Sequence, residues 1–415
     1  MFFSKQQKQV VLLYTTTVLG VLAGMLNSAL NTRSLAPGLF GDVRYVQNLI
    51  AFVSSMLLVG YFVSGSRLLA LSKSEEYSRR IRGIMCVILA LTIGIVTLSM
   101  IIMCIVTGVM HSQSQMFSLY LAAIPFCGTT LMLNYVNTTA QGDNHIVRIS
   151  IARLLPALLY FIIAFFIYKY FGATSVRMLL LFNGTSFVVL MAVILSTHPS
   201  FKGLKESFAI LNAENKSYGL NVYIGSLASV STGYIAGITL GQFADDNTNV
   251  GFFTLAQNLS SPLALLPSII GTTYFKRFAS ENKISKKVLL STIGLTVGSC
   301  LLFVILVKFV VMILYNESYY CVATYAAVLV VGTCMYGLGD VFNRFLGAHG
   351  RGKEIRNSAF ACGSVLVVGS LVLVYFFQID GAIITRILSS AVYLSFVCYY
   401  YIQFVRKQKL IKAND

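Results

Sequence analysis

Charged and amide side chains gather near the start of this chain in a pattern that could bind a polar anion. Arg33, Asp42 and Arg44 lie close together in sequence, and Gln47 and Asn48 follow within about one helical turn of Arg44. A guanidinium group is a planar fork that matches the oxygens of a phosphate, and an amide can both donate and accept hydrogen bonds. These five residues are therefore candidates for ligand binding.

Part of this pattern recurs in the second half of the chain. Gly41–Leu49 aligns with Gly251–Leu259 without gaps, and the alignment places Gln257 and Asn258 over the first amide pair. Most of the identities along this alignment are polar residues or glycine, which an apolar composition alone would not produce. The two arginines are not repeated, which suggests that they are not needed merely to build the fold.

Long apolar stretches fill the chain from Val10 to Phe404, and short polar connectors separate them. The composition is 57% hydrophobic and 11% charged, with a mean hydropathy of +0.78. A helix needs about 20 apolar residues to cross the hydrocarbon core of a bilayer. The sequence therefore predicts an all-α, polytopic membrane protein with twelve transmembrane helices. The predicted spans are Val10–Leu30, Val43–Gly65, Gly83–Thr107, Met116–Thr139, Ile151–Tyr168, Met178–Ser196, Leu220–Leu240, Val250–Thr273, Val288–Leu314, Val322–Phe345, Ser358–Phe377 and Ala382–Phe404.

The spans fall into two groups of six, so the sequence predicts two lobes. The first lobe is residues 1–197, the second is residues 218–415, and residues 198–217 are a predicted cytoplasmic linker. An even number of helices gives both lobes the same orientation, which predicts a pseudo-twofold axis along the membrane normal. The first span is expected to remain in the protein, because it is too long for the core of a cleavable signal peptide.

Basic residues mark one side of the membrane. Most of the 31 lysines and arginines fall in one alternate set of connectors, and only a few, including Arg33, Arg44 and Arg386, fall on the opposite side. The positive-inside rule then places both termini in the cytoplasm. Because the charge is spread over many short connectors, the formal net charge of +17 is a topology signal and not a nucleic-acid-binding patch.

Several polar residues interrupt the predicted spans. Asn134, Asn137 and Arg153 are candidates for a polar path, because polar groups at membrane depth tend to face a cavity; contacts between helices or an interfacial position are the alternatives. Asp340 and Arg344 stand four residues apart. Such a pair can neutralise itself on one helix face, or the carboxylate can bind a proton or Na⁺ as a coupling ion. Both interpretations of the pair stay open, as they do for Arg33 and Arg44, which could instead reach lipid headgroups.

Residues for metal, redox or nucleotide chemistry are not grouped in this sequence. The 8 cysteines are scattered through the apolar stretches, and the 4 histidines lie singly in connectors or at helix ends. No Walker A sequence is present, so direct use of ATP is not expected. The sequence predicts no metal site, no disulfide framework and no cofactor.

The segment Asn31–Gln47 resembles a known family. Its part R-x-L-x-P-x-x-F-G, from Arg33 to Gly41, is similar to the signature between the first two helices of Wzx-type O-antigen and polysaccharide flippases. That family is a branch of the multidrug/oligosaccharidyl-lipid/polysaccharide exporter superfamily, and the predicted helices, lobes and length fit it along the whole chain. The family often has glycine at the position of Ala36, which is a mild departure.

The resemblance implies a function, a location and partners. It implies a flippase of the bacterial inner membrane that moves undecaprenyl-pyrophosphate-linked oligosaccharides to the periplasmic leaflet by alternating access, as part of lipopolysaccharide or other polysaccharide synthesis. Its expected partners are the membrane, a polysaccharide polymerase and a chain-length regulator. Arginine suits the pyrophosphate, and the amides named above suit the sugar. Asp42 is a further candidate substrate-binding residue. Such a protein is not an enzyme.

Two other functions remain as alternatives. A multidrug or cation antiporter of the same superfamily needs an acid in its cavity, but the first span has only the amides Asn27 and Asn31. A membrane-embedded glycan polymerase would be expected to carry a large outer loop or a carboxylate cluster. The acidic pairs Glu75-Glu76 and Asp245-Asp246 fit solvated connectors instead.

Overall fold

A computed structural model describes residues 5–72, 74–110, 115–220, 222–224 and 232–414. Within these ranges the chain is built from helices and short turns, and no strand is present. The contacts between residues divide the chain into two compact units, Met1–Leu227 (unit 1) and Ala228–Asp415 (unit 2). The all-helical fold expected from the sequence is confirmed.

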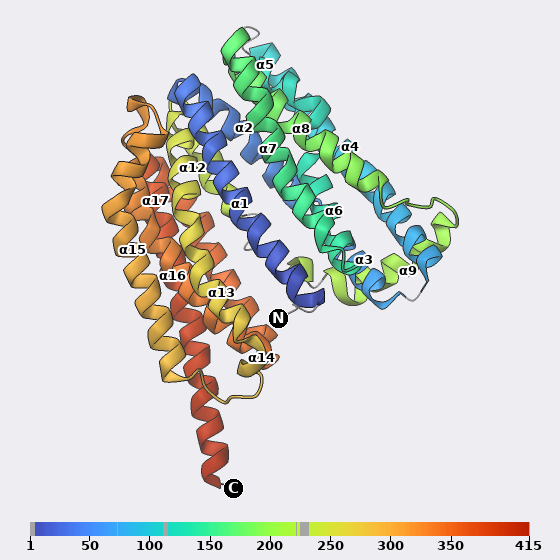
Figure 1. Ribbon diagram of the computed structural model, residues 1–415, viewed down its shortest axis with the longest axis vertical. Coiled ribbons are helices and arrows are strands. Elements are labelled where there is room, and N and C mark those ends of the chain that lie inside the picture. The colour runs from blue at the N-terminus through green and yellow to red at the C-terminus, as the bar shows by residue number, and fades with distance from the viewer. Residues whose placement is uncertain (1–4, 73, 111–114, 221, 225–231, 415) are drawn as a thin grey trace. The chain divides into compact units, whose positions relative to one another are not determined.

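Unit 1 is a bundle of packed helices. α1 lies along α7, α7 also packs against α8, and α3 packs against α6 and α4 (Figure 1). The helices of unit 1 are α1 (Lys5–Ser34), α2 (Pro37–Met56), α3 (Tyr61–Leu71), α4 (Glu75–Met110), α5 (Gln115–Ala123), the 3₁₀ turn η1 (Ile124–Phe126), α6 (Thr129–Gly142), α7 (Ile146–Phe171), α8 (Ser175–Leu195), α9 (Leu204–Glu214) and the π-helical turn η2 (Asn215–Gly219).

The bend between α2 and α3 follows from the backbone at its centre. Val59 and Gly60 have positive φ angles of 39° and 78°. Glycine adopts this conformation readily because it has no Cβ, whereas a helix cannot continue through it. The axes of α2 and α3 consequently differ by 61°. The bend falls inside the span predicted from Val43 to Gly65.

Unit 2 is organised around α16, which packs against α12, α13, α15 and α17. The helices of unit 2 are α11 (Thr232–Phe243), α12 (Thr248–Ser260), η3 (Ser261–Ala264), α13 (Leu265–Thr273), α14 (Phe275–Phe278), α15 (Lys286–Leu314), η4 (Glu317–Tyr319), α16 (Val322–Ala348) and α17 (Gly352–Asn414). In Figure 1, α15, α16 and α17 lie side by side.

The long helix α17 is two segments joined at a sharp reversal. Gln378 has φ 50° and ψ −126°, which no α-helix contains. A Cβ on Gly369 would lie 2.6 Å from the side chain of Thr385. In a straight helix these two residues would be about 24 Å apart, so the chain must fold back on itself. This agrees with the two separate spans predicted for this part of the sequence.

Several helices are suited to cross a membrane. By length and apolar composition 7 helices qualify in the part of the chain that the structure describes, or up to 8 if the bent pair α2–α3 is one span. Many large apolar side chains on them are exposed, as expected for surfaces that face lipid. A multi-pass membrane protein is therefore confirmed, whereas the number twelve and the orientation of the termini stay predictions.

The sequence repeat coincides with equivalent helix starts. α2 begins at Pro37 and α12 begins at Thr248. These starts agree to within one residue when Gly41–Leu49 is aligned with Gly251–Leu259. Both helices are then interrupted, α2 by the bend before Tyr61 and α12 by the 3₁₀ turn that contains Pro262. The two copies therefore share a local structure as well as a sequence pattern.

Most of the predicted linker, residues 198–217, packs as part of unit 1. It contains α9, which lies against α3 and α4. Its contacts are specific: Ser64 Oγ donates to Asn215 Oδ1 over 3.1 Å, and Arg67 Nη1 lies 2.5 Å from Glu214 Oε1. The segment is therefore anchored to unit 1 along much of its length.

The start of α4 is packed tightly against the chain that follows α8. A Cβ on Gly83 would collide with the carbonyl of Ser200, whose backbone N–H in turn donates to Arg79 O over 2.8 Å. Gly94, further along the same helix, has open space around it. The two glycines therefore differ in packing although they share one helix.

We expect Gly83→Ala to destabilise the protein, because the backbone near Ser200 must move, at a cost of roughly 1–3 kcal/mol. Gly94→Ala is the matched control and should be neutral or stabilising by up to about 1 kcal/mol, since alanine favours a helix. Thermal unfolding of the purified protein in detergent measures both changes. Equal melting temperatures for the two variants would contradict the close approach of Ser200 to α4.

Candidate functional site

The corner between α1 and α2 carries the first candidate residues. Arg33 lies exposed in the last turn of α1, and Asp42 and Arg44 are half-buried on α2. α2 begins at Pro37, a position where proline fits because the first helical N–H has no partner within the helix. The segment Asn31–Gln47 thus forms the corner itself, and it places its charged residues at the end of α1 and in the first turns of α2.

Arg44 is held in place along its own helix. Its Nη1 donates to Gln47 Oε1 over 2.9 Å, and its guanidinium carbon lies 4.8 Å from the centre of the Phe40 ring. Gln47 Nε2 is buried and has no hydrogen-bond partner among the described residues. Because an unpaired buried donor is costly, this amide is suited to bind an acceptor from outside the protein. Asn48 is half-buried beside it.

A neutral polar cluster, not predicted as a site, lies between α1 and α7. Asn31 Oδ1 accepts hydrogen bonds from Tyr160 Oη at 2.5 Å and from Tyr168 Oη at 3.1 Å. One turn earlier on α1, Asn27 Nδ2 donates to Ala157 O over 3.0 Å. Asn27 and Asn31, which stand in the first span where an antiporter would need an acid, are therefore buried and hydrogen-bonded to neutral groups.

The structure brings two of the predicted residues on α6 and α7 together. Arg153 Nε donates to Asn137 Oδ1 over 3.2 Å, and the arginine side chain is exposed. Asn134 lies half-buried about one turn before Asn137, on a similar face of α6. These three residues form a polar strip across two adjacent helices.

The second amide pair lies on α12, where Gln257 is half-buried and Asn258 is exposed. The nearby hydroxyl groups of Thr254 and Ser261 donate to carbonyls of their own helix, Val250 O and Asn258 O. A hydroxyl that donates to its own backbone has no donor left for a ligand, although its lone pairs can still accept. The amides are thus the better source of hydrogen-bond donors on this face.

Asp340 and Arg344 form an ion pair on α16. Arg344 Nε lies 2.8 Å from Asp340 Oδ2, and Arg344 Nη2 donates to Ser268 Oγ on α13 over 3.0 Å. Both side chains are partly exposed. The local pair considered from the sequence is therefore formed, and Ser268 joins it from a neighbouring helix.

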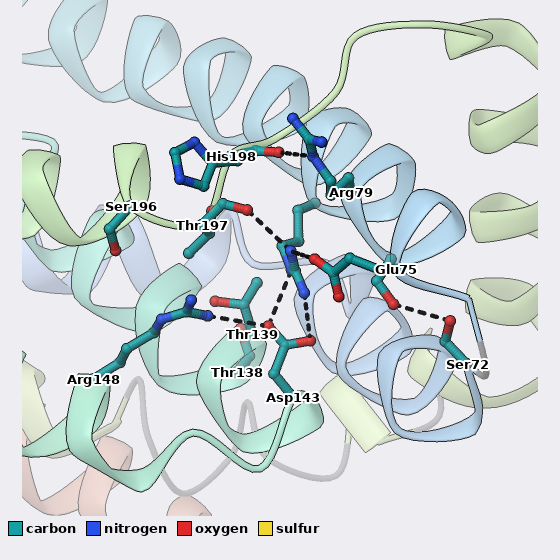
Figure 2. A network of polar contacts seen from close by, with 12 residues as sticks. Ser72, Glu75, Arg79, Thr138, Thr139, Asp143, Arg148, Ser196, Thr197 and His198 are labelled. Atoms are coloured by element: carbon teal, nitrogen blue, oxygen red, sulfur yellow. Dashed lines mark hydrogen bonds and ion pairs between the residues drawn. The ribbon is translucent and has the colours of Figure 1, made fainter.

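A buried charge network, which the sequence did not indicate, joins three parts of unit 1. Arg82 Nη2 donates to Asp143 Oδ1 over 3.1 Å, and its Nη1 donates to Glu75 Oε1 and to Thr197 O, each at 2.9 Å. Arg148 Nη1 lies 3.4 Å from Asp143 Oδ2. Figure 2 shows Arg148 and Asp143 pointing toward one another, with Glu75 and Thr197 nearby on other parts of unit 1. The side chains of Arg82 and Asp143 are 5% and 6% exposed.

This network fixes one end of unit 1. It ties the start of α4 to the α6–α7 connection and to the chain that leaves α8, and Arg79 Nε adds a hydrogen bond to His198 O over 2.8 Å. No local pattern points to it, because Arg82 and Asp143 are far apart in sequence and only the folded chain brings them together. Its buried charges neutralise each other, which is typical of a structural network and not of an open ligand site.

Comparison with known proteins identifies the fold. The chain is similar to the lipid II flippase MurJ in an inward closed conformation, with a TM-score of 0.67, 13% identity, and coverage of 96% of this chain and 90% of that chain. It is similar to an inward-facing multidrug resistance MATE transporter of the MOP superfamily, with a TM-score of 0.70, 11% identity and coverage of 94% and 95%. It is also similar to the MATE multidrug transporter DinF-BH, with a TM-score of 0.63, 12% identity and coverage of 94% and 95%.

These likenesses are of fold, because the identities are low. No family model matches the sequence, and no curated protein matches it. The fold expected from the flippase signature is nevertheless confirmed over nearly the whole chain. The Wzx-type branch and its sugar stay predictions.

We expect Asp143→Asn to destabilise unit 1, because Arg82 and Arg148 would keep their charges without a buried carboxylate. Removing one partner of a buried pair typically costs about 3–5 kcal/mol. Glu76→Gln is the matched control, since it breaks an exposed pair with Arg80 at 2.7 Å, worth about 0–1 kcal/mol. Thermal unfolding measures both variants.

The double variant Arg82→Gln, Asp143→Asn separates a charge effect from a loss of packing. It removes both charges, so it should recover part of the stability lost in Asp143→Asn alone. A double variant that is less stable by the full sum of the two single losses would show that the two side chains do not interact.

Proposed function

We propose that this protein is a flippase for undecaprenyl-pyrophosphate-linked oligosaccharides, which it moves from the cytoplasmic to the periplasmic leaflet by alternating access. The observation that carries the proposal is the fold shared over almost the whole chain with a lipid II flippase. The signature segment from Arg33 to Gly41, which forms the α1–α2 corner, supports the oligosaccharide branch of that fold.

The chemistry of the corner fits the charged part of such a substrate. Burying an isolated anion in hydrocarbon costs on the order of tens of kcal/mol by ideal solvation estimates, so a pyrophosphate needs cationic donors along its path. Arg44 is already oriented by Gln47 and Phe40, which lowers the entropic cost of binding. Together with Arg33 it offers two guanidinium forks, and Gln47 Nε2 offers one more donor.

The sugar would use the amide groups. Asn48, Gln257 and Asn258 offer donors and acceptors on α2 and α12, and the strip of Asn134, Asn137 and Arg153 offers more on α6 and α7. Amide groups can hydrogen-bond sugar hydroxyls directly or through a bridging water. The lipid tail would remain in the bilayer.

The proposal includes the finer architecture expected from the sequence. In it, twelve spans form two six-helix lobes, residues 1–197 and 218–415, with a pseudo-twofold axis along the membrane normal and both termini in the cytoplasm of a bacterium. The equivalent starts of α2 and α12 support the relation between the lobes. A polysaccharide polymerase and a chain-length regulator would act on the product.

A multidrug or cation antiporter is the second candidate, because MATE transporters share the fold. Against it, α1 contains no acidic residue, and Asn31 accepts two phenol hydroxyls in a neutral cluster. A cationic drug site in a membrane is usually built from a carboxylate. Export of a cationic dye by cells that express the chain would favour this candidate, and surface glycan display would favour the flippase.

The variant Arg33→Ala, Arg44→Ala should abolish surface glycan display in a flippase-deleted strain. Each lost charge-assisted hydrogen bond costs about 1.5–3 kcal/mol, and two arginines offer several. Arg→Lys at each position separates a phosphate contact from a headgroup anchor, because lysine keeps the charge and loses the fork. Lys308→Ala, at an exposed lysine of α15, is the control and should display normally. If the double alanine variant is present in the membrane at a normal level and displays glycan as the wild type does, both arginines would be interpreted as contacts to lipid headgroups at the interface.

Asp340→Asn tests the proposed ion coupling. If the carboxylate couples an ion to transport, the variant should lose most of its transport while it accumulates in the membrane at the normal level, because asparagine cannot bind and release a proton. If Asp340 serves only to neutralise Arg344, protein level and activity should fall together. Glycan display and immunoblotting of membranes measure the two quantities. A well-expressed variant with full transport would exclude coupling through this residue.

A further inference from the structure

Arg386, on the second segment of α17, lies beside the middle of α16. A Cβ on Gly332 would lie 3.1 Å from the Cα of Ile387, and a Cβ on Gly339 would lie 2.7 Å from the ring of Tyr393. The second segment of α17 therefore runs parallel to α16, with Arg386 level with the middle of that helix. The sequence predicts this arginine on the outer side of the membrane, and the packing shows in addition which turn of α16 lies beside it.

The guanidinium group of Arg386 contacts an aromatic ring near the middle of a long apolar helix. Its carbon lies 5.5 Å from the centre of the Tyr336 ring. Tyr336 is about 20 Å from each end of α16, at 1.5 Å per residue. It also stacks on Tyr393, with ring centres 4.9 Å apart. A hydrocarbon core is about 30 Å thick, so a residue this far from both ends of a membrane-crossing helix is expected to lie inside it.

Arg386 lacks the partners that two other shielded arginines have. Arg82 has Asp143, and Arg344 has Asp340 and Ser268. Among the described residues no carboxylate lies within 4.0 Å of the Arg386 guanidinium, and that group donates no hydrogen bond. A ring contact contributes only about 0.5–2 kcal/mol, which is small against the cost of a charge at this depth.

A second donor lies beside Arg386. Ser390 is one turn further along the same segment, on the same helix face, and is 1% exposed. Its Oγ has no hydrogen-bond partner in the part of the chain that the structure describes. An oxyanion would satisfy both groups at once, because it accepts hydrogen bonds from a guanidinium and from a hydroxyl.

We propose that Arg386 and Ser390 form a phosphate-binding site in unit 2, with the Tyr336 ring holding the guanidinium when no phosphate is present. The inference rests on the proposed function and names a second residue pair for the pyrophosphate, separate from Arg33 and Arg44 of unit 1. We place the site at Arg386 and not at Arg344 because their surroundings differ. Arg344 already has Asp340 as a counter-charge, whereas among the described residues the Arg386 guanidinium contacts only the Tyr336 ring.

The test uses the full-length protein in lipid nanodiscs, titrated with undecaprenyl pyrophosphate and with undecaprenol, which lacks phosphate. The wild-type protein should prefer the pyrophosphate, and Arg386→Gln should lower this preference about tenfold or more, since hydrogen bonds to charged groups are the strong ones. The preference of the Arg386→Lys variant should fall between those of the wild type and of Arg386→Gln. Arg406→Gln, at an exposed arginine near the end of the same helix, is the matched control and should bind as the wild type does.

Three further variants keep the test decisive if Arg386→Gln does not fold. Tyr336→Leu removes the ring and leaves the cation, so the preference should change by less than about fivefold. Ser390→Ala removes one donor and should weaken the preference measurably. Ser389→Ala is the control and should not, because the Ser389 hydroxyl donates to the Arg386 backbone carbonyl over 2.9 Å.

The outcomes distinguish this inference from the proposed function. If the wild-type protein shows no preference for the pyrophosphate and no glycan display, the flippase proposal itself fails. If the wild type shows both, and a folded Arg386→Gln variant keeps the full preference and display, then only the phosphate site in unit 2 is overturned.

Discussion

The requirement that every polar group in hydrocarbon must find a partner shapes this protein more than any other constraint. Water is absent from the bilayer core, so an unpaired donor or charge costs several kcal/mol there. Most of the chain meets the requirement locally. Thr254 and Ser55 donate to carbonyls of their own helices, and Arg344 is neutralised by an acid one turn away. Groups that are satisfied in this way stabilise helices and leave no capacity for a ligand.

Other polar groups are satisfied only by distant parts of the chain, and these fix the tertiary structure. Arg82 holds Asp143 and the carbonyl of Thr197, and Asn31 accepts hydrogen bonds from Tyr160 and Tyr168. In both clusters the charged or polar groups form hydrogen bonds with one another. They therefore act as cross-links between the helices within unit 1.

The sequence predicted those features that depend on neighbouring residues. The apolar runs predicted the helices, and the repeat of Gly41–Leu49 predicted equivalent starts for α2 and α12, because a span needs only its own composition and a cap. Asn137 and Arg153 were recognised as candidate residues from their types, but not as a hydrogen-bonded pair. The Arg82–Asp143 pair was missed, because its members lie on different helices and each looks like an ordinary connector charge.

The depth of a residue was also hard to predict from sequence alone. Counting from the ends of an apolar run placed Arg386 at an interface, whereas the contacts of Gly332 and Gly339 show which turn of α16 it faces. Small residues let two helices approach closely, and the points of close approach fix how far one helix is shifted along the other. This shift depends on pairs of residues on different helices, so a single helix sequence does not contain it.

The charges on α16 and α17 show how the same constraint separates two arginines of unit 2. Arg344 Nε lies 2.8 Å from Asp340 Oδ2, so this arginine has its counter-charge on its own helix. The Arg386 guanidinium lies 5.5 Å from the centre of the Tyr336 ring, and such a contact contributes only about 0.5–2 kcal/mol. An anion would have to displace Asp340 from Arg344, whereas at Arg386 it would replace only a ring contact, and the proposed phosphate site therefore uses Arg386.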